Sequence, residues 1–189
     1  MLIGLWAVFS WAPTWVESIT ADAVKANNLR GITMMILATS GLLGSIVTGW
    51  IANAIGLRKT MMMCFAASFI MTFMVFKMNN SISTATLLEM SVMAFFFGIS
   101  QGALSVYIPS LFPTVIRASA TGSCFNIGRF FTAMTVFFIG ALVSFLGGYG
   151  NAVFTFSFIF LIGLLFTYFS KEPTKAKHVE APVLSAFAD

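Results

Sequence analysis

Charged side chains are the scarcest feature of this 189-residue sequence. Only 8% of its residues are Asp, Glu, Lys or Arg, against roughly 25% in a typical soluble domain, and 59% are hydrophobic. A soluble chain of this size needs far more polar groups to cover its surface, so the composition excludes a soluble globular domain and a disordered chain. The formal net charge of +4 is also too small and dispersed for a typical nucleic-acid-binding protein.

Cysteine, histidine and aspartate are scarce as well, which excludes several kinds of chemistry. Cys64 and Cys124 lie far apart in apolar segments, which favours two buried apolar side chains over a disulfide or a metal site. The single histidine, His178, lies in a polar segment near the C-terminus. No His or Asp falls in a long apolar run, and no phosphate-binding loop or haem motif occurs. The sequence therefore predicts no enzyme, no cofactor and no metal site.

Long uncharged runs are abundant in their place. A helix needs about 20 apolar residues to cross roughly 30 Å of hydrocarbon. Such runs, with a break expected at the glycine-rich segment 147–151, predict an all-α membrane protein with six transmembrane helices in residues 1–170. The predicted spans are 1–17, 31–54, 60–78, 86–108, 118–145 and 151–169, and a polar cytoplasmic tail follows at 171–189.

The distribution of basic residues predicts the orientation. With six spans, both termini lie on one side of the membrane. Six basic residues fall on that side: Arg58, Lys59, Arg117, Lys171, Lys175 and Lys177. Three fall on the other: Lys25, Arg30 and Lys77. The excess predicts cytoplasmic termini in a multi-pass protein of the plasma (inner) membrane.

The start of the chain lies almost inside the first predicted span and has no basic flank. A signal peptide would need a positive segment there, and Trp6, Trp11, Pro13 and Trp15 do not suit a cleavable one. We therefore expect the chain to begin partway into a longer protein, although a genuine half-protein that dimerises is the alternative.

The fifth predicted span carries a polar stripe on an otherwise aromatic and aliphatic helix. The stripe has a three- and four-residue spacing and consists of Ser119, Gly122, Asn126, Arg129 and Ala133. If the helix starts near residue 118, Arg129 lies about 16 Å deep, where an arginine costs roughly 2.5–3.5 kcal/mol. We expect its guanidinium to face water, a carboxylate or an anionic ligand. The alternative is a structural arginine that reaches the headgroups or caps carbonyls of a broken helix.

The other spans differ in polarity. Small residues recur at four-residue spacing in the second and fourth spans, at Ser40, Gly44 and Thr48 and at Gly98 and Gly102, and predict close helix packing. The third and sixth spans are almost uniformly apolar, which is typical of helices facing lipid. The first, second, fourth and fifth spans are therefore predicted to line one half of a cavity.

Three segments resemble signatures of the major facilitator superfamily. The segment 49–59, GWIANAIGLRK, resembles its cytoplasmic loop signature, with Asn53 where Asp is usual. The segment 107–120, YIPSLFPTVIRASA, resembles the loop before the eleventh helix, with Ser110 where Glu is frequent, and the continuation 122–129, GSCFNIGR, is similar to the metabolite, aromatic-acid and sialic-acid proton symporters. The segment 171–175, KEPTK, resembles the degenerate signature after the last helix.

The resemblance covers residues 1 to about 177 and implies the C-terminal six-helix half of a major facilitator transporter. Such a half consists of two inverted three-helix repeats, and the substrate lies at the midplane between two halves. It implies a secondary active transporter of a small solute, an organic anion or a sugar, that is ion-coupled and works by alternating access. The expected partners are the solute, membrane lipid and an N-terminal half or second half-chain, and no nucleic acid.

The resemblance and the polar stripe together nominate site residues. Arg129 and Asn126 are expected to bind the anionic or polar part of the solute, Gln101 and Ser100 to supply hydrogen bonds, and Trp11 to form an apolar wall. For Gln101, the alternative is a hydrogen bond between helices. Seven residues are expected at the cytoplasmic gate and its motifs: Gly49, Asn53, Gly56, Arg58, Lys59, Pro113 and Arg117.

The sequence leaves several functional questions open. Arg58 and Lys59 would bind helix ends or acidic partners, or would only anchor the topology. Glu17 and Glu89 lie toward the outer surface, either as solvated carboxylates or as coupling groups. A structural membrane protein, an inactive half-transporter and a channel are the rival functions.

Overall fold

The structure is a computed structural model that describes residues 2–79 and 81–170, and most of these residues are helical, with no strand among them. The elements are α1 (Leu2–Ser18), α2 (Ala23–Ile55), α3 (Leu57–Phe73), the π-helical segment η1 (Met74–Met78), α4 (Thr84–Ser110), α5 (Arg117–Leu146) and α6 (Tyr149–Phe169). The predicted polar tail at 171–189, with Lys171, Lys175, Lys177, His178 and the KEPTK segment, lies outside the described residues.

Length and apolarity make the chain an all-α membrane protein, as predicted. Four helical units can cross a bilayer: Ala23–Ile55, Leu57–Met78, Thr84–Ser110 and Tyr149–Phe169. A fifth is α5, whose segments Arg117–Phe138 and Gly140–Leu146 meet at an angle of 47°. The remaining helix, α1, has 17 residues, which is the lower limit for a membrane-spanning helix. The helix bounds differ from the predicted span bounds, and the membrane boundaries stay predictions.

Local signals in the sequence set the helix ends. Asp22 caps α2, because its carboxylate accepts hydrogen bonds from the backbone nitrogens of Val24 at 2.9 Å and Lys25 at 3.3 Å. This cap explains why α2 begins eight residues before the predicted span, which was bounded by the charge of Arg30. Ser83 and Thr86 form a reciprocal capping box at the start of α4.

Glycines separate the helices that follow one another directly. Gly56, with φ 89°, divides α2 from α3. Gly147 (φ 74°) and Gly148 (φ 138°) divide α5 from α6. Positive φ angles of this kind are favourable only for glycine, so these positions end one helix and reorient the next.

The closest packing in the bundle is between α2 and α4. A Cβ atom on Gly98 would lie 2.0 Å from the carbonyl oxygen of Gly41, and one on Gly44 would lie 2.1 Å from that of Phe95. The hydroxyls of Ser40 and Ser91 are 2.7 Å apart and form a hydrogen bond across the same interface. The small residues of the second and fourth predicted spans therefore let the two backbones touch.

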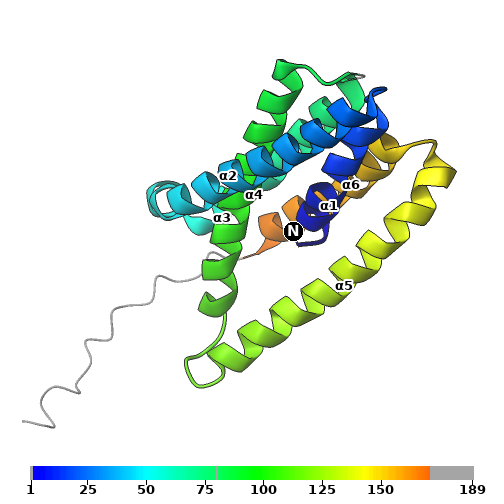
Figure 1. Cartoon of the computed structure of the whole chain (residues 1–189). Helices are drawn as coiled ribbons and strands as arrows, with labels where there is room; N and C mark the ends of the chain where they lie inside the picture. The colour runs from blue at the N-terminus through cyan, green and yellow to red at the C-terminus, as the bar shows by residue number, and fades with distance from the viewer. Residues whose placement is uncertain (1, 80, 171–189) are drawn as a thin grey trace, which may run out of the picture.

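The remaining helices surround this pair unevenly. Phe97 of α4 and Phe160 of α6 are fully buried, with ring centroids 5.5 Å apart, and join α4 to α6 in the core. Figure 1 shows α5 along one edge of the bundle, where it contacts mainly α1. Much of the α5 surface is consequently exposed within this chain.

Candidate functional site

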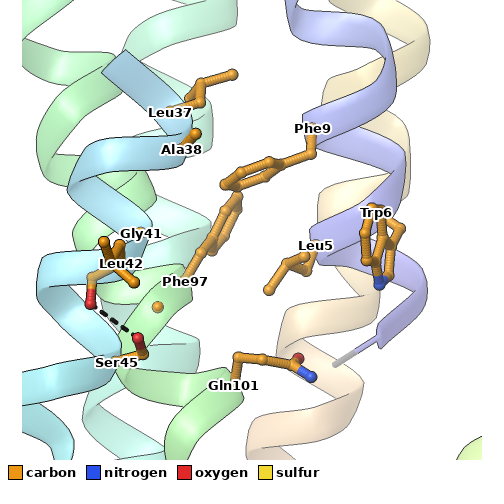
Figure 2. Close-up of a pocket in the computed structure, with 11 residues that line it drawn as sticks. Leu5, Trp6, Phe9, Leu37, Ala38, Gly41, Leu42, Ser45, Phe97 and Gln101 are labelled. Carbon is orange, nitrogen blue, oxygen red and sulfur yellow. Dashed lines mark hydrogen bonds between the residues drawn. The ribbon is translucent and has the colours of Figure 1, made fainter. Parts of the chain in front are cut away.

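A cavity of about 310 Å³ opens where α1, α2 and α4 meet (Figure 2). Its lining comes from α1 (Leu5, Trp6, Phe9), α2 (Leu37, Ala38, Gly41, Leu42, Ser45) and α4 (Phe97, Gly98, Gln101). Only Ser45 and Gln101 carry polar side-chain groups besides the indole nitrogen of Trp6. The cavity lies between three of the four helices predicted to line a cavity, and its volume falls within the range of small-molecule sites.

A second cavity of about 380 Å³ continues the first along α1 and α2. It shares Trp6, Phe9, Leu37 and Ala38 with the first cavity and adds Ser10 and Met34. The two cavities therefore form one groove between α1 and α2, which we call the α1–α2 groove. Trp6 and Phe9 lie three residues apart on α1 and share a face of the helix, so both side chains reach this groove.

Gln101 is the predicted binding residue that lies in the groove. Its side-chain oxygen is buried and has no hydrogen-bond partner among the described residues. Ser100, its neighbour, is 2% exposed and donates to the carbonyl oxygen of Phe97 at 2.7 Å. Its hydroxyl is therefore bonded to the backbone of α4 itself.

Trp11 lies outside the groove lining. Its ring stacks on Tyr149 with centroids 5.6 Å apart and an interplanar angle of 24°, which places it where α1 meets α6. The aromatic wall of the groove comes instead from Trp6 and Phe9, which the sequence reasoning missed. Aromatic residues occur on more than one face of α1, so the sequence does not show which face turns inward, although a three-residue spacing of aromatic residues was visible.

Arg129 and Asn126 lie on α5 and are both exposed. The structure gives neither side chain a hydrogen bond or ion pair within the described residues. Gly128, which precedes Arg129, lines a cavity of about 220 Å³ together with Leu2 and Ile3 of α1 and Leu104 and Ile108 of α4. Leu104 lies about one helical turn from Gln101. This cavity therefore lies about one turn along α4 from Gln101, and Arg129, the next residue after Gly128 on α5, does not line it.

The surface of α5 divides into three faces, because successive residues of a helix are about 100° apart. The packed face includes Gly128 and Thr132, and a Cβ on Gly128 would lie 2.7 Å from Leu2 of α1. The predicted polar stripe is entirely exposed and consists of Ser119, Gly122, Asn126, Arg129 and Ala133. An exposed aromatic face includes Phe130, Phe131, Phe138 and Phe145, while Phe137 continues the line of the polar stripe. The polar stripe is thus distinct from both the packed face and the aromatic face.

Arg58 connects the start of α3 to the end of α6. Its Nε donates to the carbonyl oxygen of Thr167 at 3.2 Å, and its guanidinium also donates to the carbonyl oxygen of Tyr168. The guanidinium lies 5.9 Å from the centre of the Tyr168 ring. The hydroxyls of Tyr107 and Ser170 form a second connection between α4 and the end of α6. Arg58 thus binds a helix end within this chain.

The other motif residues make fewer contacts. Arg117 donates from Nε to the carbonyl oxygen of Phe112 at 3.3 Å, within its own loop. Gly49, Asn53, Lys59 and Pro113 are exposed, and Gly56 is the helix break described above.

The two carboxylates that the sequence left open have different surroundings. Glu17 forms an ion pair with Arg30 at 2.9 Å, and both side chains are about half exposed. Glu89 is half-buried and accepts a hydrogen bond from Asn79 Nδ2 at 2.6 Å, while Asn79 Oδ1 accepts one from Thr86 at 3.1 Å. No group of three or more potential metal ligands occurs in the part of the chain that the structure describes.

Comparison with known proteins gives relatives among transporters. The cis,cis-muconate transport protein of Acinetobacter baylyi is 29% identical over 141 residues, which is 75% of this chain and 33% of that protein. The probable 4-methylmuconolactone transporter of Cupriavidus pinatubonensis is 26% identical over 165 residues, or 84% of this chain and 37% of that protein. The synaptic vesicle 2-related protein of Rattus norvegicus is 33% identical over 94 residues, or 50% of this chain and 17% of that protein.

These matches cover only part of each relative. The chain spans about a third of the length of the two bacterial relatives. No family model and no solved structure matches it.

Proposed function

Because this chain is related to transporters of the major facilitator superfamily and has the helical fold expected of one of their halves, we propose that it forms part of a secondary transporter for a small organic acid. Two bacterial relatives are named for the transport of muconate and of methylmuconolactone, which supports an organic acid over a sugar. The relatives are transporters, which argues against an enzyme.

The observation that carries this proposal is the position of the α1–α2 groove. It opens at the meeting point of α1, α2 and α4, and the predicted polar stripe of α5 is exposed beside α1. In an alternating-access carrier these four helices face a second six-helix half, and the solute binds between the two halves. We propose that such a half, in the same polypeptide or in a second one, completes the cavity.

In this scheme Arg129 supplies the positive charge for the solute. A guanidinium near mid-bilayer is costly unless it meets water or an anion, and carboxylates bind guanidinium groups through paired hydrogen bonds. Asn126, about one turn away on the same stripe, contributes a neutral hydrogen bond. We also propose that transport is coupled to an ion, and that the carboxylate that binds this ion lies in the other half.

The orientation follows from the basic residues. We propose that the end of the bundle carrying Arg58, Lys59 and Arg117 faces the cytoplasm and that the membrane is the plasma (inner) membrane. At this end, Arg58 would stabilise one gate state by holding the end of α6.

The experiment is an uptake assay with the complete gene product. Cells that produce the complete transporter should accumulate labelled muconate or a related organic acid above an empty-vector control. Arg129→Ala should lower uptake about 10-fold or more, because a hydrogen bond to a charged group contributes about 1.5–3 kcal/mol. Arg129→Lys, which retains the charge without the paired geometry, should retain more uptake than Arg129→Ala.

The thermal stability of each variant is the control. Arg129 is exposed and makes no contact that the structure records as a hydrogen bond, so Arg129→Ala should leave the melting temperature unchanged. Wild-type cells that accumulate none of the acids or sugars tested would refute the transport function. Undiminished uptake by Arg129→Ala would show that Arg129 does not bind the solute.

A further inference from the structure

We propose that the α1–α2 groove binds the uncharged middle of an elongated organic acid, and that Trp6, Phe9 and Gln101 determine which acids are accepted. The inference rests on the proposed transport function. It adds the shape of the substrate and the residues that select it.

The length of the groove favours an extended ligand. Its lining on α2 runs from Met34 to Ser45, which spans about 16 Å at 1.5 Å per residue. An extended acid of six to eight carbon atoms fits within that length. A compact four-carbon acid would leave much of the apolar lining in contact with water.

The chemistry of the groove disfavours hydroxylated solutes. Apart from the indole nitrogen of Trp6, its polar side-chain groups are those of Ser10, Ser45 and Gln101, and the Ser45 hydroxyl already donates to the carbonyl oxygen of Leu42 at 2.8 Å. A sugar-like solute would give up its hydrogen bonds to water here and gain few in return. A hydrocarbon chain loses nothing and buries apolar surface.

Gln101 gives the groove a polar end. Its side-chain oxygen is buried without a partner, which is costly unless a ligand or water supplies a hydrogen bond. In Figure 2 the Gln101 carboxamide lies at the lower end of the cavity, with the indole nitrogen of Trp6 higher on the right, and the rings of Phe9 and Phe97 lie above Gln101. The ligand therefore places its polar end toward Gln101 and its hydrocarbon part against the rings.

The ligand's charge must lie outside the groove. No lysine or arginine is among the residues that line either cavity, and a carboxylate buried without a cation is strongly unfavourable. The Gln101 end is the end about one turn from Leu104, which shares a cavity with Gly128, the residue that precedes Arg129 on α5. The groove thus binds the hydrocarbon part of the ligand, and the ligand's carboxylate lies outside the groove, on the side of α5.

The test is a binding series on the complete transporter, purified and reconstituted in lipid nanodiscs. The ligands are succinate, adipate and suberate, which carry equal charge and four, six and eight carbon atoms, and galactarate, which is a six-carbon acid with four hydroxyl groups. Affinity should rise about fourfold for each added methylene group. Adipate should bind at least 10-fold more tightly than galactarate.

Three variants test whether the groove causes the preference for long, unhydroxylated acids. Trp6→Ala should flatten the dependence on chain length, and Trp6→Phe, which keeps an aromatic ring, should preserve it. Gln101→Leu should weaken all four acids by a similar factor without changing their order. Trp50→Ala is the matched control, because Trp50 is 72% exposed on α2 and lines neither cavity, and it should leave every affinity unchanged.

The outcomes separate this inference from the proposed function. If the transporter takes up acids but binds galactarate as tightly as adipate, or if Trp6→Ala keeps the full dependence on chain length, the groove assignment is wrong and transport stands. If the wild type neither binds nor transports any acid, both are overturned. Binding that follows the predicted order without uptake supports the groove and contradicts transport.

Discussion

Arg58 donates from Nε to the carbonyl oxygen of Thr167, 3.2 Å away, although the two residues are 109 positions apart in the sequence. Together with the bond to Tyr168, this contact joins the first turn of α3 to the last turn of α6. The last carbonyls of a helix have no partner within it and carry partial negative charge, so a guanidinium there stabilises the helix end.

Removing this contact should loosen the end of the bundle. Arg58→Ala is expected to lower the free energy of unfolding by about 1–2 kcal/mol, since it breaks two charge-assisted hydrogen bonds that are partly screened by solvent. Arg58→Lys retains the charge but can restore only part of this pair of hydrogen bonds. Thermal unfolding in detergent measures the effect, and Lys59→Ala, which changes an exposed neighbour, is the control. Equal melting temperatures for the two alanine variants would contradict the role of Arg58.

The contact between α2 and α4 predicts a sharp difference between two glycines. Gly98→Ala would place a Cβ atom 2.0 Å from the carbonyl oxygen of Gly41, so the helices must separate. We expect a loss of about 1–3 kcal/mol or more, together with poor yield of folded protein. Gly31→Ala, on the same pair of helices but with no atom within 4 Å of the added Cβ, should be neutral or stabilise α2 by up to about 1 kcal/mol. Size-exclusion profiles and melting temperatures compare the two.

The three faces of α5 predict a pattern of chemical accessibility. In a Cys64→Ser, Cys124→Ser background, single cysteines at Gly122, Asn126 and Arg129 should react with a membrane-impermeant thiol reagent if, as we propose, the polar stripe faces an aqueous path. Cysteines at Phe131 and Phe138 should not react. Labelling of the aromatic face at the rate of the polar stripe would show that the stripe does not face a distinct wet cavity.

The hydrogen bond between Asn79 and Glu89 and the ion pair between Glu17 and Arg30 are expected to contribute unequally to stability. Asn79 joins the segment after α3 to α4 through Glu89 and Thr86, so Asn79→Ala should cost about 1–2 kcal/mol. Glu17→Gln breaks an ion pair whose side chains are about half exposed, and such pairs contribute about 0–1 kcal/mol. Denaturation in detergent should therefore show a clear loss for Asn79→Ala and little change for Glu17→Gln.

The fold class could be predicted from the sequence because its signals are local. Scarce charge and long apolar runs identify membrane helices, and the glycines at 147–148 mark the break that the structure places between α5 and α6. The small residues of α2 and α4 likewise encode a close approach that needs no knowledge of other helices.

The composition of the candidate site could not be predicted in the same way. The rotation of α1 about its axis depends on its neighbours, and its aromatic residues occur on more than one face, so the sequence does not show which of them line the groove. Trp11 stacks on Tyr149, while Trp6 and Phe9 line the groove. The Arg58–Thr167 contact also depends on how distant segments fold together. The π-helical segment at Met74–Met78 has no counterpart in the sequence pattern.

The near contact of the α2 and α4 backbones has a consequence for motion. Two helices whose main chains touch at Gly41 and Gly98 have no layer of side chains along which to slide, so they shift only as a single rigid block. We expect any bending during a conformational cycle to fall to α5, which packs less closely against its neighbours and already changes direction between Phe138 and Gly140.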